Sequence, residues 1–538
     1  MTTVREATYQ LLRDLGMTQV FGNPGSTELP FLRDMPPDFK YFLALHERSA
    51  AGIALGYAMG RGKAAFVNLH SVASVGNGLS AIIDAYYNHV PLVVTTGQQD
   101  RRHLQAEPFL VSRAVEGVEP YVKWACEPLR AEDVPATIAR GYYLAMQPPM
   151  GPVFISIPMD DWTQECEPVG VRDVSRRLFA DRSQLDEVCR AIDRSTNPAL
   201  VVGAQIEEDH AFDQVLALAE QLQADVYQEP IASRWTFPRR HRLFRGSLLP
   251  AQRPLAEQLA SHDTVLVLGA PVFLYYSYVP GDPIRPGTNL FQITNSPRDA
   301  AAALAGKSIV GDLADAVEYL QLKTQKRSAR NIPAREDPQT PKAEAPITPA
   351  FLFNVLNRVI PSGAIVAEEC PSSKGDLDRY LLLDQAQSFY SVRSGILGFG
   401  VPAAIGLQLA HPNRRVVCAV GDGSIQYSIQ ALWTAVQYQI PVVFLVLSNS
   451  DYSALKSFCD FTQVGRNVPG MDLPGIDIAK IATGYGMKSE TVIQHEDLEP
   501  ALTAAFSARE PRLITVRIQS DTSKCMGMDQ SVDPPKYR

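Results

Sequence analysis

The sequence lacks paired cysteines, long apolar runs and basic clusters. Its seven cysteines are scattered over 538 residues without a Cys-x-x-Cys pair, which argues against a disulfide framework and favours a reducing, cytoplasmic compartment. The longest apolar stretches, such as 441–447, fall far short of the roughly 20 residues that span a bilayer. The net charge of −8, with no basic patch among aromatics, argues against a nucleic-acid partner.

The N-terminal stretch MTTVREATYQLLRDLG carries charges every few residues and has no apolar core. We therefore expect no signal peptide there. The composition, 46% hydrophobic and 20% charged, is that of an ordinary soluble globular protein.

Short apolar runs alternate with helical patterns along the whole chain. Continuous apolar strands separated by helices are typical of parallel sheets covered on both faces, so we predict an α/β fold built from doubly wound units. The runs are AAFVNLH, PLVVTTG, PVFISIP, PALVVG, TVLVLGAPV, AIVAEE, RVVCAVGDG, VVFLVLSN and RLITVRI.

Two breaks divide the chain. Apolar periodicity is lost over 167–182, and 324–348 is rich in Lys, Arg, Pro and Glu, as in a surface linker. We therefore predict three domains of similar size, over 1–165, 183–323 and 349–520. The tail 521–538 has few apolar residues, and we expect it either to be disordered or to be pinned as a lid over another part of the protein.

The stretch LHERSAAGIALGYAMG, 45–60, reads as an apolar helix with Glu47 at its start. A carboxylate there is usually solvated and favoured by the helix dipole. The alternative is that Glu47 is buried and has a role in function.

The strongest motif joins two strand ends. A buried strand ends in Gly421-Asp422-Gly423-Ser424, and the next ends in Ser448-Asn449-Ser450-Asp451. In an open parallel sheet, ligands bind beyond the carboxyl ends of strands. A carboxylate and an amide oxygen suit Mg²⁺, and the glycines and the following helix start suit a phosphate. A plain tight turn is the alternative for GDG alone.

This pair resembles the diphosphate-binding motif of thiamine-diphosphate-dependent enzymes. Further stretches are most similar to the benzoylformate decarboxylases within that superfamily: FGNPGSTELPFL, LALHE, NLHSVASVGNGLSA, TTGQQD, GAPVF, GILGFGVPAAIG and NVPGMDLPGID. The resemblance implies a first domain for the aminopyrimidine ring, a middle domain and a third domain for the diphosphate. It also implies active sites between subunits of a homo-oligomer, commonly a dimer of dimers.

The resemblance assigns roles to individual residues. Glu47 matches the glutamate that hydrogen-bonds the aminopyrimidine ring and thereby activates thiazolium C2; burial against an uncharged ring would keep its pKa raised. Metal ligands are implied at Asp422, Asn449 and Asp451. Cofactor contacts are implied at Glu47, Asn77, Ser372, Gly395, Leu397, Gly421, Asp422, Gly423, Ser424, Asn449, Asp451 and Tyr452. Among these, the Gly395 carbonyl would take the cofactor's amino group, and Leu397 would wedge the cofactor into a bent shape.

Other matches concern the substrate. His70 matches a histidine that assists proton transfer, and Ser26 a serine that holds the substrate. Taken alone, each is more ordinary: a structural histidine and a turn serine. Further pocket positions implied are Pro24, Gly25, Ser26, Phe109, Leu110, Lys374, Arg393 and Phe458.

The sequence departs from the relatives at Tyr276, where they carry a second histidine that helps protonation after CO₂ leaves. Tyrosine is a poor proton shuttle at neutral pH, so either Tyr276 or water does the job, or an added aldehyde intercepts the intermediate. The alternative is that Tyr276 merely packs a pocket wall. Lys374 and Arg393 stand where relatives have small or apolar residues. They either face solvent or predict a substrate with an additional anionic or strongly polar group.

Three functions therefore remain open. The first is non-oxidative decarboxylation of an aromatic or bulky 2-oxo acid, using thiamine diphosphate and Mg²⁺. The second is a carboligase or lyase of the same superfamily, resembling acetolactate synthase or a 2-hydroxyacyl lyase. The third is a catalytically silent paralogue, against which Glu47, Asp422 and Asn449 speak.

Overall fold

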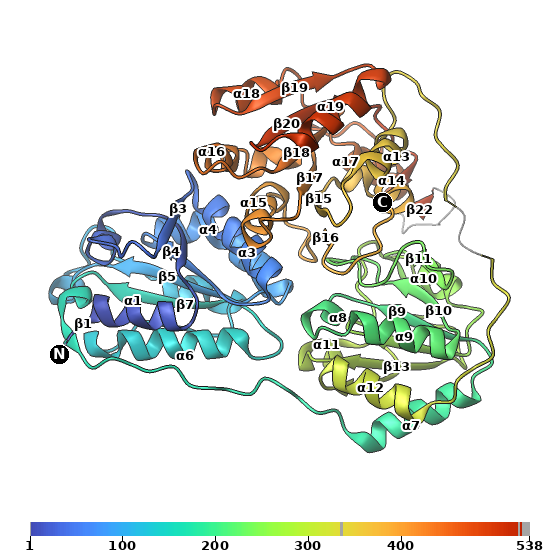
Figure 1. The fold of residues 1–538 in the computed structure, drawn as a ribbon, viewed down its shortest axis with the longest axis horizontal. Coiled ribbons are helices and arrows are strands. Elements are labelled where there is room, and N and C mark those ends of the chain that lie inside the picture. The colour runs from blue at the N-terminus through green and yellow to red at the C-terminus, as the bar shows by residue number, and fades with distance from the viewer. Residues whose placement is uncertain (1, 334–336, 526–527, 530–538) are drawn as a thin grey trace.

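The computed structural model describes residues 2–333, 337–525 and 528–529. Three six-stranded parallel sheets, each covered by helices, form separate units in Figure 1. Two short antiparallel pairs also form, β1 (Thr2–Thr3) with β8 (Glu165–Cys166) and β21 (Lys524–Cys525) with β22 (Met528–Asp529). The predicted α/β fold with three doubly wound sheets is confirmed.

The first sheet has the strand order β3-β2-β4-β5-β7-β6. One core, with the helices α1 and α6, lies against one face, and a second core, with α3 and α4, lies against the other. Every residue of β4 and β5 is buried, which is why these strands read as continuous runs. The elements are α1 (Val4–Asp14), β2 (Gln19–Asn23), α2 (Leu29–Leu32), β3 (Lys40–Leu43), α3 (Glu47–Arg61), β4 (Ala65–Leu69), α4 (Val72–Tyr87), β5 (Leu92–Gln98), α5 (Ala114–Val118), β6 (Ala125–Cys126), α6 (Val134–Met146) and β7 (Val153–Pro158).

The middle sheet has the order β11-β10-β9-β12-β13-β14, so its chain starts near the centre and winds outward in both directions. The helices α7, α9 and α12 cover one face, and α10 lies on the other. The elements are α7 (Arg182–Arg194), β9 (Pro198–Val202), α8 (Gln205–Glu208), α9 (Phe212–Leu222), β10 (Asp225–Gln228), β11 (Phe244–Ser247), α10 (Gln252–Gln258), β12 (Thr264–Leu268), β13 (Asn289–Thr294), α11 (Pro297–Ala302), β14 (Lys307–Val310) and α12 (Leu313–Lys323).

The third sheet has the order β16-β15-β17-β18-β20-β19. Its central strands β17 and β18 carry the two polar strand ends singled out from the sequence, and they are direct neighbours. The elements are α13 (Pro349–Val359), β15 (Ile365–Glu369), α14 (Lys374–Tyr380), β16 (Phe389–Tyr390), α15 (Gly400–Ala410), β17 (Val416–Gly421), α16 (Ala431–Gln437), β18 (Val443–Ser448), α17 (Ser453–Thr462), α18 (Ile478–Gly484), β19 (Lys488–Val492), α19 (His495–Ser507) and β20 (Arg512–Arg517).

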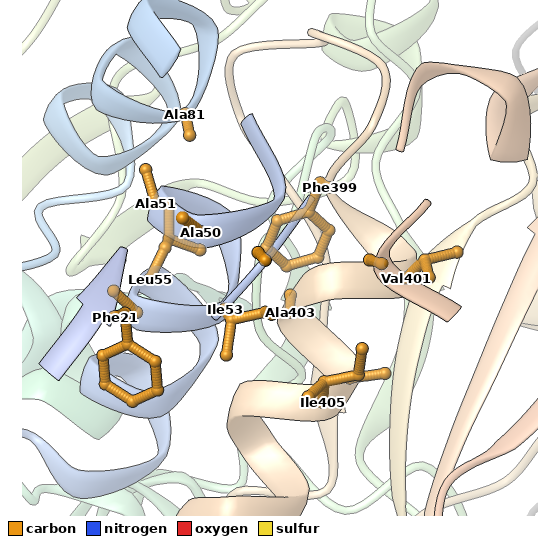
Figure 2. Packing of buried hydrophobic residues seen from close by; sticks show 14 of the residues in the cluster. Phe21, Ala50, Ala51, Ile53, Leu55, Ala81, Phe399, Val401, Ala403 and Ile405 are labelled. Carbon is orange, nitrogen blue, oxygen red and sulfur yellow. The ribbon is translucent and has the colours of Figure 1, made fainter. Parts of the chain in front are cut away.

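The helices α3 and α15 join the first and third units through one continuous core (Figure 2). Their backbones approach so closely that a Cβ on Gly56 would lie 2.2 Å from the carbonyl oxygen of Ala403. A Cβ on Gly406 would lie 2.0 Å from the carbonyl oxygen of Ile53. Glycine is therefore required on both helices. The contact fixes Glu47, at the start of α3, relative to the segment that leads into α15.

The segments 167–181 and 324–348 contain neither helix nor strand among their described residues. The second is not detached from the middle unit, because Arg327 donates to the carbonyl oxygen of Ser195 (2.7 Å) and Arg330 pairs with Asp225. Among the described residues no helix combines the length and apolar character needed to cross a membrane.

Candidate active site

Glu47 is the first residue of α3, and it is buried rather than solvated, with 8% of its surface exposed. Asn23 Nδ2 and Ser74 Oγ donate to its Oε1 at 3.1 and 2.9 Å, and Asn77 Nδ2 donates to its Oε2 at 3.0 Å. Burial raises the pKa of Glu47, but hydrogen bonds from its own backbone N–H and from these side chains outweigh it, so the pKa lies below its usual range. The raised pKa expected for Glu47 against a cofactor ring stays a prediction.

His70 follows β4 and lies against the turn at Gly25. A Cβ on Gly25 would lie 2.4 Å from the imidazole, so only glycine fits. The Nδ1 atom of His70 is 2.9 Å from Thr27 Oγ1 and 2.9 Å from Glu28 Oε2. Glu28 is almost completely buried and also accepts from the backbone N–H groups of Gly25 (2.8 Å) and Gly97 (2.9 Å). Direct contacts thus hold Gly25, Glu28 and His70 together.

The motif at Asp422 has the expected strand-end geometry. Asp422 is buried, and its carboxylate accepts from the backbone N–H groups of Gly423 (2.9 Å) and Ser450 (2.7 Å), so it bridges β17 and β18. Burial raises the pKa of Asp422 above its usual range despite these hydrogen bonds. The segment after GDG differs from the expected helix, since a 3-10 turn spans Ser424–Tyr427 and α16 begins only at Ala431.

Asn449 and Asp451 occupy the neighbouring strand end. Asn449 Nδ2 donates to Ser453 Oγ at 2.7 Å, and its side-chain oxygen accepts from Asp451 N at 3.2 Å. The carboxylate of Asp451 already accepts from Ser453, from Lys456 Nζ (3.0 Å) and from Ser520 Oγ (2.9 Å). The Asp451 carboxylate is therefore already hydrogen-bonded to side chains of the same subunit.

Four other implied cofactor residues of the third unit lie at these strand ends or beside the start of α17: Ser372, Gly421, Ser424 and Tyr452. The backbone N–H of Tyr452 donates to Met471 O at 2.9 Å, and Ser372 Oγ accepts from Ala454 N at 3.0 Å. Ser424 is buried at the start of the 3-10 turn, and Gly421 ends β17. Gly395 and Leu397 lie on the segment between β16 and α15, with Gly395 exposed and left-handed at φ +72°.

The implied substrate-pocket residues come from separate elements. Tyr276 and Phe458 lie together, with ring centroids 5.7 Å apart, at a contact between the middle and third units. Tyr276 is 60% and Phe109 88% exposed, and Leu110 follows Phe109 in a left-handed turn. Pro24 and Ser26 are exposed beside the turn at Gly25.

Lys374 and Arg393 both have carboxylate partners inside the chain. Lys374 Nζ lies 3.1 Å from Glu368 Oε2 and stacks over Phe389, and Arg393 lies 3.7 Å from Asp299 Oδ2. Both side chains are largely shielded from solvent, with 23% and 8% exposed, so they are not solvent-facing cations.

The residues present fit a diphosphate and a hard cation. Asp422 and Asn449 supply carboxylate and amide oxygens, the donor types that Mg²⁺ prefers. A Cβ on Gly423 would lie 2.6 Å from Tyr452 Cε1, so glycine keeps this cradle open. A buried carboxylate of raised pKa, such as Asp422, is also the group that a divalent cation would stabilise.

Sequence reasoning missed Glu28, Thr27 and Ser74, although all three lie within stretches that it quoted. Only their position within those stretches could have indicated them. Glu28 lies 42 residues before its partner His70, so sequence spacing does not reveal the contact. For the tail 521–538, Thr522 accepts from Arg466 (2.7 Å), whereas 526–527 and 530–538 lie outside the described residues.

Three family models match the chain, one to each unit. They are the N-terminal TPP binding domain, the central domain and the C-terminal TPP binding domain of thiamine pyrophosphate enzymes, over residues 2–116, 185–320 and 372–516.

Several proteins are similar over nearly the whole chain. Benzoylformate decarboxylase of Pseudomonas aeruginosa is 42% identical, covering 97% of this chain and 99% of that protein. Among solved structures, 4-hydroxybenzoylformate decarboxylase of Rhodococcus jostii RHA1 is 40% identical with a TM-score of 0.94, covering 97% of this chain and 100% of that one. Benzoylformate decarboxylase of Polynucleobacter necessarius is 39% identical with a TM-score of 0.95, covering 97% and 99%.

Proposed function

Because the chain belongs to the thiamine pyrophosphate enzyme family, we propose that it decarboxylates an aromatic or bulky 2-oxo acid to an aldehyde and CO₂. The reaction is non-oxidative and uses thiamine diphosphate and Mg²⁺. The observation that carries the proposal is the buried Glu47, held by three side-chain donors at the start of α3. Relatives named as benzoylformate and 4-hydroxybenzoylformate decarboxylases support the aryl substrate.

The ends of β17 and β18 would hold the cofactor's diphosphate and its metal ion. Asp422 and Asn449 would bind Mg²⁺ through side-chain oxygens. Since the Asp451 carboxylate is engaged by Lys456 and Ser520, Asp451 would contribute its main-chain carbonyl. When bound, the cofactor supplies an electron sink for the bond that breaks.

Glu47 would exchange a proton with the aminopyrimidine ring. In the protein alone the surrounding donors favour its ionised form. An uncharged ring placed against it would remove solvent from the carboxylate and raise its pKa toward the range that proton sharing needs. Asn77 and the other donors orient the carboxylate for this exchange.

The substrate side would be formed by the turn at Gly25 and the aromatic residues. Ser26 would bind the substrate carboxylate or carbonyl, and His70, oriented through its Nδ1 by Glu28, would move protons from Nε2. Phe109, Leu110 and Phe458 would give an apolar wall for the aryl group. We assign Lys374 and Arg393 to internal ion pairs rather than to substrate binding.

A carboligase is the second candidate, and the Tyr276 substitution is the observation that favours it. Tyr276 donates its backbone N–H to Pro250 and packs on Phe458, so it is held at the proposed pocket without a histidine's proton shuttle. The three relatives described above are all named as decarboxylases, which favours the first function.

We further propose a homo-oligomer, a dimer or a dimer of dimers, whose sites lie between the first domain of one subunit and the third domain of another. The exposed Gly395 and Phe109 would then be covered by the partner subunit. The working domain boundaries remain 1–165, 183–323 and 349–520. Six cysteines are free, in keeping with a cytoplasmic enzyme: Cys126, Cys166, Cys189, Cys370, Cys418 and Cys459.

The test is incubation of the purified protein with thiamine diphosphate, Mg²⁺ and a panel of 2-oxo acids, with and without added aldehyde. Release of CO₂ with equimolar free aldehyde from benzoylformate-like acids is the expected result. Hydroxyketone with little free aldehyde would instead establish the carboligase. Absence of cofactor binding by calorimetry would refute both functions, whereas cofactor binding without any product would indicate the silent paralogue.

A further inference from the structure

The segment 391–399, between β16 and α15, holds both residues assigned to the shape of the cofactor, Gly395 and Leu397. Its turns need glycine, with φ +72° at Gly395 and +100° at Gly398. Residues 391–399 form neither helix nor strand, so no regular pattern of backbone hydrogen bonds fixes this segment. Its conformation therefore depends on the side chains of other elements that reach it.

The first unit reaches this segment through a buried ion pair. Arg48 and Asp84 have side chains 4% and 0% exposed, and Arg48 Nη2 lies 2.6 Å from Asp84 Oδ2. Arg48 also donates to the carbonyl oxygen of Leu397 at 3.3 Å. A Cβ on Gly398 would lie 3.0 Å from Arg48 Nε, so the guanidinium packs directly on the turn.

Asp84 holds the other side of the same turn. Its Oδ1 accepts from Ser394 Oγ, and Ser394 Oγ in turn accepts from the backbone N–H of Ile396 at 3.2 Å. The ion pair thus contacts the residues on both sides of Gly395. Asn88, one turn after Asp84, accepts from Arg393 N at 3.1 Å.

The third unit adds a second anchor just beyond. The buried carboxylate of Glu369, at the end of β15, accepts from the backbone N–H groups of Gly398 and Gly400 (2.7 Å for Gly400). The turn is therefore held from two directions, by β15 of its own unit and by α3 and α4 of the first unit.

A buried ion pair is weak evidence for stability, because desolvation offsets most of its attraction, and fixing one conformation is a better-attested use. We propose that the Arg48–Asp84 pair is a positioning device that fixes the Ser394–Leu397 turn, so that the Gly395 carbonyl and the Leu397 side chain meet the cofactor's pyrimidine ring. This inference rests on the proposed function. Because Arg48 directly follows Glu47, the same helical turn holds the catalytic carboxylate of one proposed intersubunit site and the cofactor-shaping turn of another.

The test compares binding of thiamine diphosphate with binding of its analogue lacking the pyrimidine amino group, by calorimetry with Mg²⁺. The analogue cannot donate to the Gly395 carbonyl, so the ratio of the two dissociation constants reports where that carbonyl lies. The variants are Ser394→Ala and the double variant Arg48→Met/Asp84→Leu, which leaves no unpaired buried charge. The matched control is Arg101→Met/Asp161→Leu, an ion pair at 2.6 Å that contacts no residue of the turn in any described interaction.

The native protein and the control are expected to prefer thiamine diphosphate, and both turn variants to lose that preference by about tenfold or more. A folded double variant that keeps the native ratio would overturn the proposal. If the double variant fails to fold, Ser394→Ala decides by the same criterion. If the native protein itself shows no preference, the assignment of Gly395 in the proposed function fails, and the positioning role fails with it.

Discussion

The carboxylate oxygen Oε2 of Glu28 lies 2.9 Å from Nδ1 of His70. A buried acceptor at Nδ1 favours the imidazole form that carries its proton there and leaves Nε2 free. Glu28 is itself fixed, since the backbone N–H groups of Gly25 and Gly97 donate to it. A residue absent from the sequence motifs thus sets the orientation of a proposed proton-transfer group.

We predict that Glu28→Gln lowers kcat by roughly 10²-fold, in the range of a general acid–base contribution, with a smaller change in KM. The amide keeps the shape of the carboxylate but offers Nδ1 a weaker acceptor. Steady-state kinetics with the best 2-oxo acid measures both constants. Thr27→Val, which removes the other oxygen near Nδ1, serves as the comparison. Equal, small effects of the two substitutions would contradict the role of Glu28.

The nine apolar runs identified in the sequence are all strands, because each is buried on both faces of its sheet. The runs do not include the other strands of the three sheets, each of which is an edge strand or the neighbour of one: β2, β3, β6, β10, β11, β13, β14, β16 and β19. The strand-end motifs could be predicted because their spacing follows the βαβ repeat. The partners of buried groups, such as Glu28 for His70 and Asp84 for Arg48, could not, because they depend on contacts between distant elements.

Glu47→Gln is predicted to bind thiamine diphosphate with nearly native affinity yet to lose proton exchange at thiazolium C2. The amide still fits among Asn23, Ser74 and Asn77 but cannot exchange a proton with the ring. Calorimetry gives the affinity, and hydrogen–deuterium exchange followed by NMR gives the C2 rate. A native exchange rate in this variant would refute the role given to Glu47.

His89 is predicted to make the protein less stable in acid. Its Nδ1 lies 3.9 Å from Glu208 at the contact of the first and middle units, and burial lowers its pKa to about 3. Between the unfolded value of 6.5 and about 3, only the unfolded chain binds this proton, so stability falls as pH falls through that window. Below pH 6, the folding stability of His89→Asn relative to the native protein should therefore increase by about 1.4 kcal/mol for each unit by which the pH falls.

Glu208, the neighbour of His89, is predicted to change the stability with pH in the opposite direction. Burial raises the pKa of Glu208 to about 8, so its ionisation costs stability as pH rises from about 4.5 to 8. The folding stability of Glu208→Gln relative to the native protein should therefore increase as the pH rises. Thermal unfolding of both variants and the native protein from pH 5 to 8 measures the two trends. Parallel curves for native and His89→Asn protein would show that His89 is not buried in its neutral form.

Tyr276→His tests whether this position controls the fate of the intermediate after CO₂ leaves. A histidine there can exchange protons at neutral pH, so free aldehyde should increase severalfold relative to hydroxyketone when an acceptor aldehyde is present. The control is Tyr278→His, a similarly exposed tyrosine two residues further on (63% against 60%). An unchanged product ratio in Tyr276→His, or the same change in both variants, would exclude position 276 as the determinant.

Gly423→Ala is predicted to weaken binding of thiamine diphosphate with Mg²⁺ by at least about tenfold, roughly 1.4 kcal/mol. The backbone at Gly423 has φ −74° and tolerates alanine, so the effect comes from space alone. The new Cβ would lie 2.6 Å from Tyr452 Cε1 and 3.2 Å from Leu473 Cδ1, which pushes the β18 strand end away from Asp422. Gly484→Ala, where nothing lies within 4 Å, is the matched control. Adding Tyr452→Ala should recover part of the affinity, because it removes the atom that clashes. Native affinity in Gly423→Ala would mean that this strand end does not cradle the diphosphate.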